Sequence, residues 1–218
     1  MNMERNVPEV VIRRLPRYYR YLGELLKDGI NRISSGALSK KMNVTASQIR
    51  QDFNYFGGFG QQGYGYNVEY LYNEMGEILG LHDGDTTIII GAGNLGRALA
   101  NHNTFEKRGF RLVGIFDNNA EKIGSVINNI KILDISCLKQ FISENRVDIA
   151  ILTVPKSEVH DISEVLADSG VMGILNFSYT DIKLSHDTII ENVHMSDHLM
   201  MLSYKIATKR KELWDYMH

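Results

Sequence analysis

The stretch 88-IIIGAGNLGRALA-100 decides the fold that we expect for this chain. A run of isoleucines leads into glycines at positions 91, 93 and 96, and small residues that can open a helix follow them. In a strand–turn–helix unit the first glycine permits the tight turn, the second lets the backbone approach a pyrophosphate, and the third lets the helix pack closely on the sheet. The stretch predicts a dinucleotide-binding turn, with a purely structural turn as the alternative.

An acidic residue at the right distance strengthens this prediction. Asp117 lies 21 residues beyond Gly96, at the end of the apolar run 110-FRLVGIFD-117. A carboxylate there accepts hydrogen bonds from the adenosine ribose and repels a 2′-phosphate, so the pattern favours NAD(H) over NADP(H). Backbone N–H groups at the start of the helix would face the phosphates. The residues of the turn that we expect to contact the nucleotide are Gly91, Ala92, Gly93, Asn94, Leu95 and Gly96.

Residues 83–195 alternate apolar runs with segments of helical length. The five strand candidates are TTIIIGAG, FRLVGIFD, VDIAILTVP, GILNF and TIIENV. Such alternation is typical of βαβ units around a buried, mainly parallel sheet. Residues 196–218 read as one amphipathic helix, which either packs on its own domain or contacts a partner subunit.

The first 82 residues carry a different, mainly helical pattern. In 45-TASQIRQDFNYF-56 we expect Thr45 and Gln48 to form a capping box at a helix start. The apolar face of this helix would be Ala46, Ile49, Phe53 and Phe56. Its polar face, without a carboxylate, would be Ser47, Arg50, Gln51 and Asn54. Such a face suits a recognition helix, because Arg pairs with guanine and Gln or Asn with adenine.

The flanking segments complete a winged helix-turn-helix. A short helix after Ser34 or Ser35 precedes the turn, and 56-FGGFGQQGYGY-66 has the glycines of a tight β-hairpin wing. A plain helical subdomain is the alternative. The residues predicted to contact DNA are Lys40, Lys41, Thr45, Ser47, Gln48, Arg50, Gln51, Asn54, Tyr55, Gln61 and Gln62. The expected fold class is thus α/β: a winged helix-turn-helix domain over 1–82, a Rossmann-like NAD(H)-binding domain over 83–195, and a C-terminal helix over 196–218.

Charge and composition agree with an anionic partner for the first domain. Residues 1–60 hold ten Lys and Arg against five Asp and Glu, whereas residues 61–218 hold fourteen against twenty-one. No apolar run approaches the roughly 20 residues that span a bilayer. The lone Cys137 fits a reducing compartment, and we expect it to lie in the core. We therefore expect a cytoplasmic protein that does not bind membranes.

No motif in the sequence supplies an acid or base for hydride-transfer chemistry. The candidate proton carriers are His102, His160 and His194, and none lies in a catalytic pattern. His194 and His198 have the i, i+4 spacing of a metal pair, but a break near Ser196 would place them on different elements. We expect neither an enzyme nor a metal site.

The chain as a whole resembles the Rex family of redox-sensing transcriptional repressors. The resemblance lies in 14-RLPRYYRYL-22, 48-QIRQDFNYFG-57, 63-GYGY-66, 90-IGAGNLGRAL-99, 149-IAILTVP-155 and 173-GILNF-177. It implies a homodimer whose C-terminal helix is swapped onto the partner, and release from double-stranded operator DNA as the NADH/NAD⁺ ratio rises. It also implies that Thr153, Val154 and Pro155 line the nicotinamide side, with Phe177 nearby.

This sequence departs from the family pattern in the wing and the switch. Gln61 and Gln62 stand where the family carries Lys or Arg, so we expect weaker phosphate contacts and a shallower salt dependence. His102 and His194 stand where the family has Tyr and Asp, which in that family join the arginine matching Arg20 in coupling the two domains. The family motif NFAP is NFSY here, and Val159 and His160 replace its Ala-Gln.

Three interpretations follow from the sequence. The first is a repressor that senses NADH/NAD⁺ and leaves its operator when NADH binds. The second is an NAD-dependent oxidoreductase with a reduced substrate site. The third is a DNA-binding protein whose nucleotide switch has degenerated. We favour the first, because both a reader helix and a dinucleotide turn are present in one chain.

Overall fold

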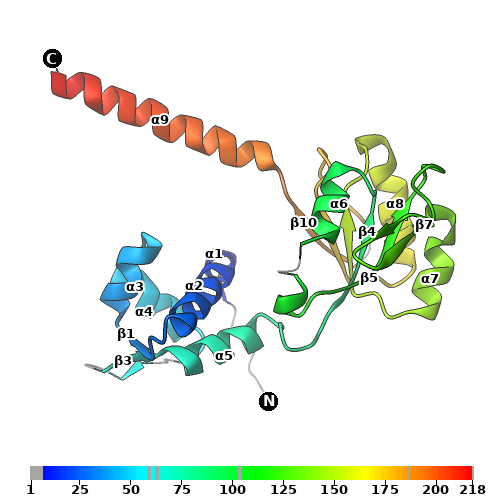
Figure 1. Ribbon diagram of the computed structural model, residues 1–218. Helices are drawn as coiled ribbons and strands as arrows, with labels where there is room; N and C mark the ends of the chain where they lie inside the picture. The colour runs from blue at the N-terminus through cyan, green and yellow to red at the C-terminus, as the bar shows by residue number, and fades with distance from the viewer. Residues whose placement is uncertain (1–6, 58–59, 62–63, 103–104, 186, 218) are drawn as a thin grey trace. The chain divides into compact units, whose positions relative to one another are not determined.

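The computed structural model describes residues 7–57, 60–61, 64–102, 105–185 and 187–217. The chain divides into two compact units, residues 1–83 (the first unit) and 84–218 (the second unit). Figure 1 labels the helices and strands of both units.

The first unit is a helical domain with a small antiparallel sheet. Its helices are α1 (Glu9–Ile12), α2 (Leu15–Lys27), α3 (Ser35–Met42), α4 (Ala46–Asn54) and α5 (Val68–Ile78). Its strands are β1 (Arg32–Ile33), β2 (Gly60–Gln61) and β3 (Gly65–Asn67), in the order β1-β3-β2. The β2–β3 pair lies in the segment predicted as the wing. Of the two wing glutamines, Gln62 lies outside the described residues.

Local sequence signals explain where these helices begin. Ser34 caps α3 by accepting a hydrogen bond from the backbone N–H of Ala37 at 3.0 Å, and Thr45 caps α4 in the same way from Gln48 at 3.1 Å. The capping box is only half formed, because the Gln48 side chain donates to Asp52 instead of returning to the backbone of Thr45. A single core that includes Tyr18, Leu22 and Phe53 joins α2 to α4.

The second unit is built on a seven-stranded sheet, in the order β10-β9-β8-β4-β5-β7-β6. The strands are β4 (Thr86–Ile90), β5 (Arg111–Asp117), β6 (Val126–Ile127), β7 (Ile130–Asp134), β8 (Ile149–Leu152), β9 (Gly173–Asn176) and β10 (Ile189–Asn192). All neighbours pair in parallel except β6 and β7, which form an antiparallel hairpin. The five strands expected from the sequence are confirmed. The prediction missed β6 and β7. β6 has only two residues, and β7 mixes apolar with charged residues, so neither gives a clear strand pattern in the sequence.

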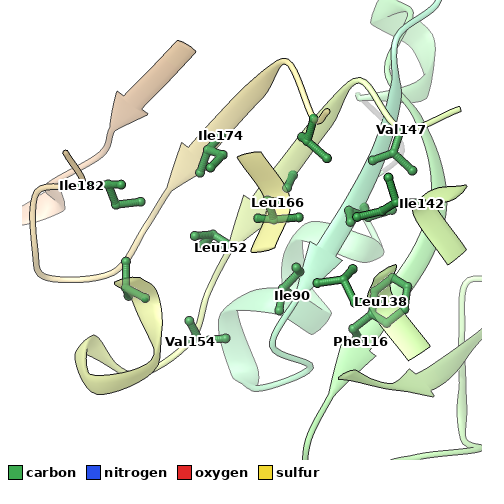
Figure 2. Close-up of a cluster of buried hydrophobic side chains, with 14 residues drawn as sticks. Ile90, Phe116, Leu138, Ile142, Val147, Leu152, Val154, Leu166, Ile174 and Ile182 are labelled. Atoms are coloured by element: carbon green, nitrogen blue, oxygen red, sulfur yellow. The ribbon is translucent and has the colours of Figure 1, made fainter. Parts of the chain in front are cut away.

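Helices cover both faces of the sheet. Ile88 and Ile90 of β4 face a core shared with α7 (Leu138–Glu144) and α8 (Lys156–Asp168), which Figure 2 shows. Ile89 faces the other side and packs in a cluster with Ala100 of α6 (Asn94–Ala100). An apolar cluster thus lies on each face of β4, as expected for a strand that is buried on both sides.

The remaining elements of the second unit include two short 3₁₀ turns and a long terminal helix. The turns are η1 (Glu106–Arg108) and η2 (Ile135–Cys137), and the helix is α9 (Met195–Met217). The prediction that Cys137 lies in the core is wrong: it is exposed, because it closes the η2 turn after β7 and does not point inward from α7. The apolar side chains of α9, such as Leu199 and Leu202, are exposed.

Candidate functional site

The glycine turn after β4 is shaped by two close backbone approaches. Gly91 has a φ of +100°, and a Cβ there would lie 2.7 Å from the carbonyl oxygen of Thr153. A Cβ on Gly96 would collide with the carbonyl oxygen of Gly91. The protein itself therefore requires glycine at both positions.

Gly93 is different, because nothing in the described part of the protein requires it to be glycine. Its φ is −76°, which any residue adopts, and a Cβ there would have no atom of the described residues within 4 Å. Gly93 borders open space at the head of α6 and lines a cavity. A glycine that faces open space fits a position where a ligand approaches the backbone closely.

A cavity of about 510 Å³ opens at the carboxyl ends of β4, β5 and β8. This volume lies within the roughly 300–1,000 Å³ range of small-molecule and cofactor sites. The position is where parallel sheets bind ligands, beside the strand at which the chain order reverses. The residues that line it are Ile90, Gly91, Gly93, Leu95, Asp117, Asn118, Lys122, Ile135, Thr153, Val154, Pro155, Lys156, Glu158, Ile162, Phe177, Ser178 and Tyr179.

The structure brings most of the predicted cofactor residues to this cavity. Gly91, Gly93, Leu95, Asp117, Thr153, Val154, Pro155 and Phe177 are among its lining residues. Ala92, Asn94 and Gly96 belong to the same turn but do not line the cavity: Ala92 and Gly96 are buried, and Asn94 is the exposed first residue of α6. These three shape the turn that the others present.

Asp117 is tied to the glycine turn by hydrogen bonds. Its Oδ2 accepts the backbone N–H of Ala92 at 2.7 Å and the Nζ of Lys122 at 3.0 Å. Its Oδ1 accepts the backbone N–H of Asn119 at 2.8 Å. Burial acts to raise the pKa of Asp117, but these hydrogen bonds and the Lys122 charge outweigh it and hold the pKa below the ordinary value. The carboxylate is therefore ionised at neutral pH and supports the turn directly.

Sequence reasoning missed the polar and apolar residues at the far end of the cavity. Lys122 follows Asp117 by five residues, so its position in 119-NAEKIG-124 was a usable signal for a cation near the ribose site. Glu158 and Ile162 come from α8, and Ile135 from the turn after β7. No local sequence pattern could place Ile135, Glu158 and Ile162 at the cavity, because only the order of strands in the sheet brings them together.

In the first unit, α4 presents the polar face that was predicted for it. Ile49, Asp52 and Phe53 are buried, whereas Ser47, Arg50, Gln51 and Asn54 are exposed. Of the other predicted DNA contacts, Lys40, Lys41 and Thr45 are exposed and Gln48 and Tyr55 half-buried. Arg50 reaches back to α3, donating to the Ser35 Oγ at 3.0 Å, and the Nζ of Lys41 lies 5.0 Å from the ring centre of Tyr21.

Asp52 holds the buried side of α4 through a charged network. Its carboxylate accepts both Nε and Nη2 of Arg14, at 2.7 and 2.8 Å, the Tyr18 hydroxyl at 2.8 Å and the Gln48 amide at 2.9 Å. Desolvation acts to raise its pKa, but hydrogen bonds from Arg14, Gln48 and Tyr18 outweigh this and lower the pKa below its ordinary value. Burial and the bond to Asp52 raise the pKa of Tyr18. The network fixes α4 against α2.

The three predicted switch residues lie on different units. Arg20 is an exposed residue of α2, and His102 is exposed just after α6. His194, directly before α9, has its Nε2 2.8 Å from the Oδ1 of Asp181. The carboxylate of Asp181 thus lies beside His194. The coupling of His102 and His194 to Arg20 stays a prediction.

Among the described residues, no group of three or more His, Cys, Asp or Glu side chains is placed to hold a metal ion. Within the same part of the chain, no helix is long and apolar enough to cross a membrane.

Comparisons with known proteins match both units. A family model described as the N-terminus of putative DNA-binding proteins matches residues 6–54, and one described as a CoA binding domain matches residues 83–180. The redox-sensing transcriptional repressor Rex of Thermoanaerobacter pseudethanolicus is 54% identical over 206 residues, which cover 94% of this chain and 92% of the relative. This chain belongs to the Rex family.

Further members of the family are similar in sequence to this chain over nearly its whole length. Rex of Clostridium tetani is 50% identical over 94% of this chain and 97% of the relative. Among solved structures, the repressor RSP in complex with β-NAD⁺ and operator DNA is 53% identical, covers 97% of this chain and 96% of its own, and superposes with a TM-score of 0.87. RSP in complex with β-NADH superposes with a TM-score of 0.88 at 50% identity, over 97% of this chain and 99% of its own. The resemblance seen in the sequence is confirmed.

Proposed function

We propose that this chain is a transcriptional repressor that binds operator DNA through its first unit and leaves it when NADH binds to the second. The observation that carries the proposal is the cavity at the glycine turn, formed in the same chain as an α3–α4 pair with a polar, carboxylate-free outer face. The relative RSP, crystallised with β-NAD⁺ and operator DNA and separately with β-NADH, supports both ligands.

The nucleotide would lie along the carboxyl edge of the sheet. The pyrophosphate would lie over Gly93 at the head of α6, where open space and backbone N–H groups meet. The ribose would lie at Asp117, and the nicotinamide at Thr153, Val154 and Pro155, with Phe177 nearby. Asp117 already accepts three donors in this structure, two of them at Oδ2. One ribose hydroxyl would bind at Oδ1, which accepts only Asn119, and a second would compete with Lys122 for Oδ2.

The DNA contacts would come from the exposed face of α4 and the end of α3. Ser47, Arg50, Gln51 and Asn54 would face the major groove, and Lys40, Lys41, Thr45 and Tyr55 the backbone. Gln48 is the least available of the predicted contacts, because its amide donates to Asp52. Gln61 and Gln62 would form an uncharged wing with a shallow salt dependence.

The repressor would act as a homodimer in the cytoplasm, with no catalytic step. The exposed apolar residues of α9, among them Leu199, Leu202 and Ile206, support a helix that is covered by a partner subunit. Two copies would place their α4 helices in successive major grooves of a near-palindromic operator. NADH would favour an arrangement with a different spacing, through its differential affinity for the two states.

Operator-binding curves with NADH, with NAD⁺ and without nucleotide, at two salt concentrations, test the proposal. NADH should weaken operator binding, and linkage requires operator DNA to weaken NADH binding by the same factor. Equal NADH affinity with and without saturating operator would refute the switch. It would leave the third interpretation, a DNA-binding protein with a degenerate nucleotide response.

A further inference from the structure

The cavity extends past Asp117 into a compartment that the glycine turn does not explain. Its walls are Asn118 after β5, Ile135 after β7, and Glu158 and Ile162 of α8. If the proposed function holds and a dinucleotide places its pyrophosphate at Gly93 and its ribose at Asp117, the base lies beyond the ribose, in this compartment. The two isoleucines are half-buried and supply the apolar part of a slot for a planar ring.

The polar part of the compartment is a donor–acceptor pair. The Nδ2 of Asn118 lies 3.4 Å from both Oε1 and Oε2 of Glu158. Hydrogen bonds of this length are weak, so either group can exchange its partner for a ligand. Side by side, the two groups offer one donor, from the amide, and one acceptor, from the ionised carboxylate.

We propose that Glu158 and Asn118 read the adenine base of the nucleotide. Glu158 accepts a hydrogen bond from the exocyclic N6 amino group, and Asn118 donates to the neighbouring ring nitrogen. This pattern complements adenine, which presents an amino donor next to a ring-nitrogen acceptor. Glu158 is the discriminating residue, since an amide can reverse its donor and acceptor by rotation and an ionised carboxylate can only accept.

Hypoxanthine reverses the pattern at the position that decides the discrimination. It carries a carbonyl oxygen where adenine has the N6 amine, so an unchanged pose would place that oxygen against the Glu158 carboxylate. Hypoxanthine also carries a hydrogen on the neighbouring ring nitrogen, which the Asn118 amide can accept by rotating its oxygen into place. Glu158→Gln restores a donor to the carbonyl oxygen, so this variant should accept hypoxanthine. The expected discrimination is modest, because Glu158 is half-buried and Asn118 is exposed, so water can partly solvate an unpaired group.

The test measures binding of NADH and of reduced nicotinamide hypoxanthine dinucleotide to the full chain, by the fluorescence of the bound reduced nicotinamide. The unsubstituted protein should bind the hypoxanthine analogue about tenfold more weakly than NADH, the size expected for one mismatched hydrogen bond to a charged group. In Glu158→Gln the two affinities should become close to equal. Asp161→Asn, which neutralises an exposed carboxylate of the same helix outside the cavity, should keep the original ratio.

The outcomes separate this inference from the proposed function. Tight NADH binding without discrimination, or discrimination that Glu158→Gln leaves unchanged, would overturn the base-reading pair and leave the NADH sensor intact. Failure of the unsubstituted protein to bind either dinucleotide would overturn both.

Discussion

Asp52→Asn tests whether the buried network holds the reader helix in place. The substitution keeps the shape of the side chain and replaces one carboxylate oxygen by an NH₂ group. Each oxygen now accepts two bonds: Oδ1 from Arg14 and Gln48, and Oδ2 from Arg14 and Tyr18. The amide is best accommodated with NH₂ at the Oδ2 position, because the Tyr18 hydroxyl can turn and accept. That leaves the Nε–H of Arg14 without an acceptor.

The size of the effect follows from burial. Removing one partner of a fully buried ion pair destabilises a protein by about 3–5 kcal/mol. The Asp52 side chain is fully buried, but 23% of the Arg14 side chain is exposed, so water can recover part of the loss. We expect the free energy of unfolding of the first unit to fall by about 2–3 kcal/mol. For a unit of this size that lowers Tm by roughly 10–20 °C.

Thermal unfolding followed by circular dichroism, with NADH binding as a check on the second unit, measures this effect. Asp28→Asn is the matched control, because it neutralises an exposed carboxylate at the end of α2 and should leave Tm unchanged. Operator affinity at 20 °C should fall for Asp52→Asn even where the unit remains folded, since α4 loses its fixed orientation. If Asp52→Asn and Asp28→Asn have the same Tm, the network does not hold the helix.

Three further predictions concern acid stability, the turn and the reader. The pKa of Asp52 is lower in the folded protein than its unfolded value of about 3.9. The stability that ionised Asp52 contributes is therefore complete above that value and is lost as the pH falls through the folded pKa. In Asp52→Asn this part of the fall in stability with acid should be absent from the unfolding free energy measured against pH. Gly93→Ala should leave the melting of the second unit unchanged and weaken NADH binding measured by calorimetry, whereas Gly96→Ala should lower both; equal melting of the two variants would contradict the distinction. Arg50→Ala should reduce operator affinity by about 1–3 kcal/mol and relax base preference, and an equal loss on random DNA would make Arg50 a phosphate contact.

The sequence by itself determined the local parts of the molecule. The isoleucine run and the glycine spacing predicted the turn and its strand, because both depend on residues near one another along the chain. Asp117 was recognised by its spacing of 21 residues from Gly96 in the dinucleotide-binding pattern. Thr45 predicted the start of α4, and the alternation of apolar and polar residues predicted which face is buried. These features follow from backbone geometry and periodicity, which a linear pattern carries.

Only the tertiary structure decided which distant side chains meet. Asp52 is bonded to Arg14, 38 residues earlier, which fixes its carboxylate on the buried side of α4. The Gln48 amide that looked available for DNA donates to this same carboxylate. Glu158 reaches Asn118 across 40 residues at the edge of a sheet whose strand order differs from the chain order. Burial strengthens the Asp52–Arg14 pairing, because a charge removed from water is stable only beside a partner, wherever in the sequence that partner lies. The Asn118–Glu158 contact is exposed and weaker, but it too joins residues that only the fold brings together.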